Sequence, residues 1–154
     1  MAFTLTSNDF KDGDVLPDAH VQAKGDRAPH LAGSGAPEGT KSFAVTLFDP
    51  DAPTGSGFWH WTVANIPADV SEIPAGGPVP RGAVEGRTDY GSPGFGGAAP
   101  PPGRGPHRYI FTVFAVDTET LDVTPDNSGA VFGFNLHFHT LAKATITATY
   151  ENKG

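Results

Sequence analysis

The 154-residue sequence contains no cysteine, which excludes disulfide bonds, cysteine-ligated zinc and thiol catalysis. Basic residues are also scarce, because 10 Lys and Arg stand against 17 Asp and Glu and the formal net charge is -7. This balance argues against nucleic acid or an anionic membrane surface as a general partner. A local basic pocket is compatible with this balance.

Long apolar runs are absent as well. No stretch approaches the length of a membrane span, and the N-terminus lacks the basic region and apolar run of a secretory signal. We therefore expect a cytoplasmic protein. The length favours a single domain over residues 1–154, with one core that buries roughly two thirds of the unfolded surface.

Glycine and proline are abundant, with 20 and 15 residues. They separate short runs rich in valine, isoleucine, threonine and aromatic residues, which is typical of a mainly β fold and excludes most long helices. Alternation of apolar and polar residues indicates most of the strands. The predicted strands span residues 3–7, 43–49, 59–66, 83–86, 108–117 and 144–150.

The segment 128–143 predicts a helix. A Pro-Asp-Asn-Ser turn precedes it, and apolar residues recur at helical spacing. The predicted face consists of Val131, Phe132, Asn135, Phe138, Leu141 and Ala142. A helix also separates His137 from His139 by about 200°, so we predict structural roles for them rather than a metal pair.

The stretch "FDPDAPTGSGFWHW", residues 48–61, places two carboxylates on a constrained turn. Asp49 ends an apolar strand, and Asp51 follows across a proline. One interpretation is a strand-ending turn, which short aspartate side chains favour. The other is a polar site, because His60 opens the next strand. Period-two alternation places His60 on the face opposite Trp59 and Trp61.

The stretch "APPPGRGPHRYIF", residues 99–111, joins a rigid loop to a strand. Its prolines and glycines hold one irregular loop shape that other residues could not adopt. In the strand, His107 and Tyr109 point the same way and Arg108 the opposite way. The pair is either a set of hydrogen-bond donors or a buried histidine beside a strand tyrosine. Arg108 is expected to pair with an acidic turn residue.

The glycine-rich stretch 89–105 could present backbone N–H groups to an anion. It lacks the Gly-Lys-Ser/Thr ending of a P-loop and the strand-to-helix context of a dinucleotide fingerprint, so nucleotide binding by either route is not expected.

In combination these motifs resemble the phosphatidylethanolamine-binding protein (PEBP) family, in particular its bacterial Raf kinase inhibitor-like branch. The similar stretches are Asp-Pro-Asp-Ala-Pro at 49–53, "HWTVANIP" at 60–67, Pro-Pro-x-Gly-x-Gly-x-His-Arg-Tyr at 100–109 and "HTLAKATITATY" at 139–150. The resemblance covers most of the chain. It implies a Greek-key β-sandwich with one C-terminal helix and a small pocket for phosphate-like anions.

The resemblance also assigns residues to that pocket. The ligand-binding residues it implies are Asp49, His60, Ala99, Pro100, Pro101, His107 and Tyr109. Beyond the resemblance, we expect the pocket rim to include Asp51, Pro53, Trp59, Tyr90, Phe95 and Gly97. Family members often carry a cis proline in the Asp-Pro-Asp-Ala-Pro turn, which makes Ala52–Pro53 the expected cis bond.

The sequence departs from the family pattern in three places. Gly33 stands where a tryptophan is common, and Gly97-Ala98-Ala99 replaces the usual residues before the proline pair. The chain also ends soon after its last strand, without the longer C-terminal helix that flanks the site in animal members. Kinase regulation of the animal kind therefore does not transfer directly.

The residues and the resemblance together predict non-catalytic binding of a phosphate-type anion or phospholipid headgroup, in the manner of a kinase-inhibitor-like regulator, with no cofactor and no metal. In this hypothesis Asp49 orients a histidine and raises the pKa of His60. One alternative is an interaction module that inhibits a kinase or protease through its surface, and a homodimer is open. Another is a metal-dependent hydrolase built on the Asp and His residues.

Overall fold

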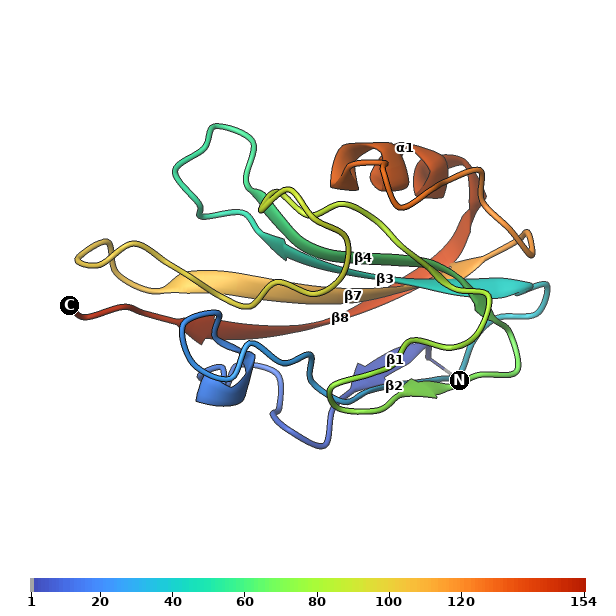
Figure 1. Cartoon of the computed structure of the whole chain (residues 1–154). Coiled ribbons are helices and arrows are strands. Elements are labelled where there is room, and N and C mark those ends of the chain that lie inside the picture. The colour runs from blue at the N-terminus through green and yellow to red at the C-terminus, as the bar shows by residue number, and fades with distance from the viewer. Residues whose placement is uncertain (1) are drawn as a thin grey trace.

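The computed structural model describes residues 2–154 as two antiparallel β-sheets packed face to face (Figure 1). The larger sheet has the strand order β6-β4-β3-β7-β8, and the smaller has the order β1-β2-β5. The strands are β1 (Thr4–Thr6), β2 (Leu31–Ser34), β3 (Ser42–Asp49), β4 (Phe58–Pro67), β5 (Glu72–Ile73), β6 (Val84–Glu85), β7 (His107–Val116) and β8 (Thr140–Tyr150). Because β7 returns beside β3 after a long connection, the predicted Greek-key β-sandwich is confirmed.

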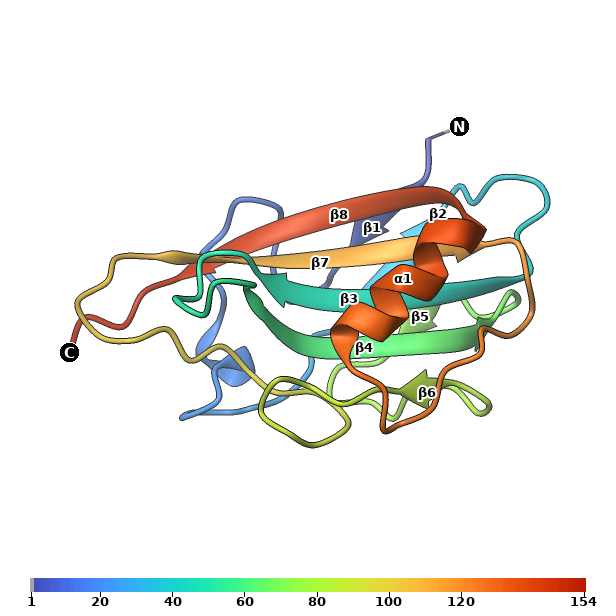
Figure 2. The same cartoon turned by 90° about the horizontal axis from the view of Figure 1, so that it is seen from above.

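The main core lies between the two sheets, and alternation in the long strands builds it. Val45 and Leu47 of β3 point into this core together with Phe111 and Val113 of β7. A second apolar cluster lies on the other face of the larger sheet, beneath the helix α1 (Gly129–His139). Figure 2 shows α1 lying across that outer face.

The helix is shorter than its predicted range. It begins after Ser128, whose hydroxyl accepts a hydrogen bond from Val131 N, and it ends at His139. Thr140 is already extended, with ψ of 122°, and begins β8. The run from Thr140 to Tyr150 pairs with β7 along its length, so sheet hydrogen bonding overrides the helical spacing of Leu141 and Ala142.

The predicted helix face is also wrong in part. The residues that α1 buries are Gly129, Phe132 and Leu136, whereas Val131 and Phe138 are exposed. Apolar residues occur on both sides of this helix, so their spacing alone could not identify the side that faces the sheet.

Strands β3, β4, β6 and β7 lie within two residues of their predicted bounds. The strands β2 and β5 were not predicted, because four and two residues are too short for a clear alternation. The short 3-10 helix η1 (Asp18–His20) follows the N-terminal turns. Within residues 2–154, no helix is long and apolar enough to span a membrane.

The expected cis bond at Ala52–Pro53 is wrong. Among residues 2–154 the cis peptide is Gly77–Pro78. The turn after β3 instead closes with a trans bond before Pro53, through a hydrogen bond from Thr54 N to the carbonyl of Ala52 at 2.8 Å.

The N-terminal segment covers part of an exposed sheet edge. β8 is the last strand of the larger sheet, and β7 pairs with only one side of it. On its other side, Gly13 N donates to Thr147 O at 2.7 Å and Leu16 N donates to Thr149 O at 2.8 Å. Asp14 accepts in return from Thr149 N at 3.0 Å.

Candidate functional site

A β-bulge at the start of β4 determines where His60 points. Phe48 pairs with Trp59 and Leu47 with Trp61, so His60 has no partner residue on β3. A bulge re-aims side chains and is common near functional sites. As a result Trp59 packs against Phe48, with ring centroids 4.5 Å apart, on the face that α1 covers. The predicted strict alternation, with Trp59 and Trp61 on one face, is therefore wrong.

The bulge brings His60 to a pocket of about 240 Å³ at the end of the larger sheet. The loop after β3 and the start of β4 contribute Asp49, Ala52, Pro53, Thr54, Phe58 and His60. The glycine- and proline-rich connection and the start of β7 contribute Tyr90, Ala99, Pro101 and His107. Segments that are far apart in the sequence thus form one concave site.

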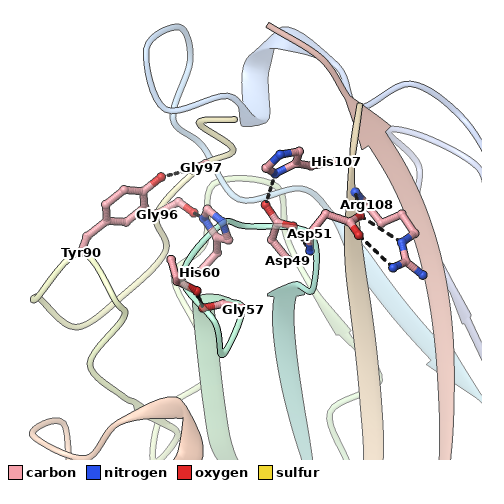
Figure 3. A network of polar contacts seen from close by, with 10 residues as sticks. Asp49, Asp51, Gly57, His60, Tyr90, Gly96, Gly97, His107 and Arg108 are labelled. Carbon is pink, nitrogen blue, oxygen red and sulfur yellow. Dashed lines mark hydrogen bonds and ion pairs between the residues drawn. The ribbon is translucent and has the colours of Figure 1, made fainter. Parts of the chain in front are cut away.

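Asp49 and His107 form a buried pair in this pocket (Figure 3). His107 Nδ1 lies 2.7 Å from Asp49 Oδ2. The other carboxylate oxygen of Asp49 accepts from Asp51 N at 2.8 Å, so both oxygens are occupied. Since a carboxylate only accepts, the proton of the neutral His107 ring lies on Nδ1, and Nε2 is left without a partner among residues 2–154.

His60 is oriented by a backbone carbonyl rather than by Asp49. Its Nδ1 lies 2.9 Å from the carbonyl of Gly96, which assigns the ring proton to Nδ1. Burial lowers the pKa of His60, and the nearby Gly96 carbonyl and Asp49 carboxylate offset this only in part. The expected rise in the pKa of His60 is therefore wrong, because desolvation of the imidazolium outweighs the attraction of Asp49.

A second set of contacts fixes the wall that holds His60. The hydroxyl of Tyr90 donates to Gly97 O at 2.7 Å, and Gly97 N donates to Asp26 Oδ1 at 2.8 Å. Burial, with smaller effects from the Asp26 and Asp49 carboxylates, raises the pKa of Tyr90 to about 12. Tyr90 is therefore a neutral donor at physiological pH, and its proton is already engaged.

Tyr109 lies deeper than the pocket surface. It is fully buried, and its ring packs edge-on against His60 with centroids 5.5 Å apart. Its hydroxyl makes no hydrogen bond with residues 2–154, and burial together with the Asp49 carboxylate raises the pKa of Tyr109 above its usual range. The structure places it behind the histidine rather than in the pocket lining.

Arg108 pairs with an acidic turn residue, as predicted. Its Nε and Nη2 donate to Asp51 at 3.0 and 2.9 Å, and its backbone N donates to the same carboxylate at 2.8 Å. This fork lowers the pKa of Asp51 to about 2. The pair anchors the loop after β3 to the start of β7, on the side away from the pocket.

The substitution Asp51→Asn is expected to lower the free energy of unfolding at neutral pH by about 1 kcal/mol, because both partners are partly exposed and water screens the pair. The folded-state pKa is depressed, so the contribution is complete above the ordinary value of 3.8 and disappears as pH falls through about 2. Denaturant unfolding at a series of pH values checks this.

The control for this series is Asp69→Asn, which changes an exposed aspartate with no ion pair or side-chain hydrogen bond in the described chain. It should follow the wild type at every pH. A stability difference for Asp51→Asn that stays constant down to the lowest pH would contradict the role of the ion pair.

The structure brings together most of the residues that the sequence assigned to the site. Among the implied ligand-binding residues, those that line the pocket are Asp49, His60, Ala99, Pro101 and His107. Pro53 and Tyr90 line it from the predicted rim. The remaining predicted residues, which lie outside the lining, are Asp51, Trp59, Phe95, Gly97, Pro100 and Tyr109. Phe95 packs edge-on against Trp61 instead.

Sequence reasoning missed Ala52, Thr54 and Phe58 as lining residues. Phe58 packs against both His60 and Tyr90, with centroids 4.8 Å apart in each case. Its position two residues before His60 was the available signal, because period-two alternation places both residues on the same face of a strand. Thr54 donates its hydroxyl to Gly57 O at 2.6 Å.

The geometry gives no support for a metal centre. Within residues 2–154, no three His, Asp or Glu side chains come together in a way that could hold a metal ion. Asp51 in particular is committed to Arg108.

The protein is a two-sheet β-sandwich whose pocket, at one end of the larger sheet, contains an Asp–His pair and a second histidine. The family model described as phosphatidylethanolamine-binding protein matches residues 6–151, so the chain belongs to that family. This confirms the resemblance found in the sequence.

Individual relatives are similar over nearly the whole chain. The UPF0098 protein YbhB of Escherichia coli K12 is 54% identical and covers 96% of this chain and 99% of its own. The crystal structure of E. coli YbcL, reported as a new member of the mammalian PEBP family, has a TM-score of 0.96 at 50% identity, covering 99% and 100%. A PEBP homologue of Chlamydia trachomatis has a TM-score of 0.88 at 28% identity, covering 99% of each chain. None of these names carries an enzymatic activity.

Proposed function

We propose that the pocket binds a phosphate-type anion, as a phosphate monoester or a phospholipid headgroup, without converting it chemically. The observation that carries this proposal is the pair of histidines at one small pocket. In both His60 and His107, an acceptor holds Nδ1, and Nε2 has no partner among residues 2–154. Membership of the phosphatidylethanolamine-binding protein family supports a binding role.

The other polar side chains of the lining are already occupied. Thr54 donates to Gly57 O, Tyr90 donates to Gly97 O, and Asp49 accepts with both oxygens. The remaining walls, such as Pro53 and Pro101, are apolar. The two imidazole Nε2 atoms are therefore the polar contacts that the side chains of the lining keep for a ligand.

The two histidines suit different oxygens of the anion. When a second proton binds at Nε2, the His107 ring donates from Nδ1 to the Asp49 carboxylate and from Nε2 to a negatively charged oxygen of the ligand. His60 is neutral because burial lowers its pKa, so its Nε2 accepts a hydrogen bond. It therefore fits the P–OH group of a monoanionic phosphate, or it takes up a proton when a fully charged anion enters.

The pocket size limits the ligand. Its volume of about 240 Å³ is below the range of roughly 300–1,000 Å³ of drug-sized ligand sites. It therefore fits a phosphoryl group with a small substituent and not a whole phospholipid.

An NMR titration with inorganic phosphate, and then with phosphoethanolamine, is expected to shift the ring-proton signals of His60 and His107 saturably. His107→Ala is expected to weaken phosphate binding about 10- to 100-fold, because a charge-assisted hydrogen bond worth about 1.5–3 kcal/mol is lost. Tighter binding of phosphoethanolamine than of phosphate would indicate a headgroup ligand. Sulfate, which carries no proton at neutral pH, should bind more weakly than phosphate if His60 accepts from P–OH.

His139→Ala is the matched control, because His139 also pairs with an aspartate but lies at the end of α1, outside the pocket. It should leave phosphate binding unchanged. If no histidine shifts saturably, or if His107→Ala binds phosphate as well as the wild type, the pocket is not an anion site. Inhibition of a kinase or protease through the surface would then be the function to test.

A further inference from the structure

The peptide group between Gly96 and Gly97 lies between two side chains. Its carbonyl oxygen, Gly96 O, is 2.9 Å from His60 Nδ1, and its N–H, at Gly97 N, donates to Asp26 Oδ1 at 2.8 Å. The N–H and C=O of a trans peptide point to opposite sides of the chain. Asp26 and His60 therefore contact opposite ends of one rigid group, although Asp26 lies outside the lining of the anion pocket.

The peptide groups on either side have contacts of their own. Gly96 N donates to His60 O at 2.9 Å, and Gly97 O accepts from the hydroxyl of Tyr90 at 2.7 Å (Figure 3). These contacts hold the chain before and after the central peptide group, but they do not determine which way that group faces. Glycine on both sides gives it the conformational freedom to turn over. Its orientation thus depends on its contacts with His60 and Asp26.

Asp26 is held so that its carboxylate reaches this peptide group. Its φ of 49° lies in the left-handed region, which aspartate tolerates better than most residues. Asp26 N donates to Val21 O at 2.9 Å, and Gln22 N donates to Ala98 O at 2.8 Å. The loop that carries Asp26 is thus attached to the pocket wall at two successive residues, Gly97 and Ala98.

The orientation of the peptide group determines what His60 can offer a ligand. With the carbonyl towards the ring, the proton of neutral His60 lies on Nδ1, and Nε2 accepts a hydrogen bond. If the peptide group turned over, its N–H would face the ring, the ring proton would move to Nε2, and His60 would donate to the ligand instead. A carboxylate that accepts from the N–H also polarises the carbonyl, which strengthens the hydrogen bond to His60.

We propose that Asp26 is a positioning residue of the anion pocket. It holds the Gly96–Gly97 peptide group so that His60 Nε2 accepts, and it thereby makes the site prefer an anion that carries a proton, such as a monoanionic phosphate, over one that carries none, such as sulfate. The second half of this rests on the proposed function, the binding of a phosphate-type anion. Each histidine of the pocket is then fixed by an aspartate, because Asp49 holds His107 directly and Asp26 holds His60 through one peptide group.

Nitrogen-15 NMR of the imidazole rings in the ligand-free protein tests the effect on His60. Asp26→Gly removes the carboxylate but suits the positive φ, so the variant should fold. Its His60 ring should be protonated on Nε2 in part or completely, whereas the wild type should carry the proton on Nδ1. Asp26→Asn should keep the wild-type tautomer, because its side-chain oxygen still accepts from Gly97 N.

Titration calorimetry with phosphate and with sulfate at neutral pH tests the effect on ligand choice. The wild type should prefer phosphate, and Asp26→Gly should lower the ratio of the two affinities by roughly 2- to 10-fold, the effect of one ordinary hydrogen bond. Asp26→Asn should keep the ratio. The matched control is Asp18→Ala, which removes a nearby carboxylate that contacts Lys24 and Tyr150 instead. It should change neither the tautomer nor the ratio.

An Asp26→Gly variant with the tautomer and the affinity ratio of the wild type would overturn the proposal, and so would a wild type whose His60 is protonated on Nε2. A change of tautomer without a change of the ratio would overturn the effect on ligand choice alone. If the wild type binds no phosphate, the proposed function fails, while the tautomers of the ligand-free variants still decide whether Asp26 positions His60. Circular dichroism confirms that each variant is folded.

Discussion

Replacing Asp49 with alanine is expected to lower the free energy of unfolding by about 3–5 kcal/mol. The carboxylate is buried and occupies both oxygens, with His107 Nδ1 at 2.7 Å and Asp51 N at 2.8 Å. Alanine leaves both donors without an acceptor in a buried site. An unsatisfied buried donor costs more free energy than an ordinary hydrogen bond contributes to stability. Denaturant unfolding followed by tryptophan fluorescence measures the loss.

Two variants separate the reasons for this effect. Asp117→Ala removes a carboxylate that lies 2.9 Å from His139, but both side chains of that pair are more than 40% exposed, so the loss should be below about 1 kcal/mol. Asp49→Asn should lose less than the alanine variant, because its amide can donate to His107 Nδ1 after the ring proton moves to Nε2. Nitrogen-15 NMR of the ring would show that change of tautomer. Equal losses for Asp49→Ala and Asp117→Ala would contradict the importance of burial.

Gly97→Ala is expected to lower the free energy of unfolding by about 3 kcal/mol. A Cβ atom at Gly97 would lie 2.6 Å from Gln22 N, 2.6 Å from His20 O and 2.9 Å from Val21 C. All three are backbone atoms, which cannot turn away as the end of a side chain can. The neighbouring Gly96 carbonyl orients His60, so the variant should also change the His60 NMR signal in the folded protein.

Gly133→Ala is the matched control for this prediction. The same methyl group meets no atom within 4 Å there, and alanine in a helix interior is favoured over glycine by up to about 1 kcal/mol. The control should therefore be as stable as the wild type or slightly more stable. If Gly97→Ala is as stable as the wild type, the backbone from His20 to Gln22 must be able to move away from the new methyl group. The pocket wall that orients His60 would then be less rigid than its contacts indicate.

The sequence predicted a mainly β fold because alternation is strong in the long strands, whereas the sandwich itself was implied by the resemblance to the family. In β3 and β7 the core residues Val45, Leu47, Phe111 and Val113 recur at every second position, and that period alone assigns them to one face. The pocket loops were also predictable, because proline and glycine mark them and aspartate and histidine residues flank them. Motifs that adjoin strand ends in this way place side chains at one edge of a sheet.

The pairing within the site could not be predicted from the same patterns. The bulge at His60 depends on the register between β3 and β4, and no residue in the Trp-His-Trp run marks it. Trp59 was expected at the pocket rim, and Asp49 was expected to raise the pKa of His60. Instead Asp49 pairs with His107 on β7, and the Gly96 carbonyl holds His60.

The predicted direction of the pKa change at His60 was wrong for a related reason. The attraction between a carboxylate and an imidazolium can be expected from the two residue types alone. The desolvation of the imidazole depends on how many atoms from distant segments of the chain enclose it. His60 is enclosed by Phe58, Tyr90 and Tyr109, which come from three separate parts of the chain. Burial of that kind is a property of the fold and is not visible in a local motif.

The segment that lies along the edge of β8 has a consequence for solubility. An uncovered edge strand offers unpaired N–H and C=O groups to any other extended chain and is a common starting point for aggregation. Here Gly13, Asp14 and Leu16 occupy those groups at Thr147 and Thr149, in the half of the strand that ends beside the pocket loops. A few residues that belong to neither sheet thereby protect the longest strand of the protein from pairing with a foreign chain.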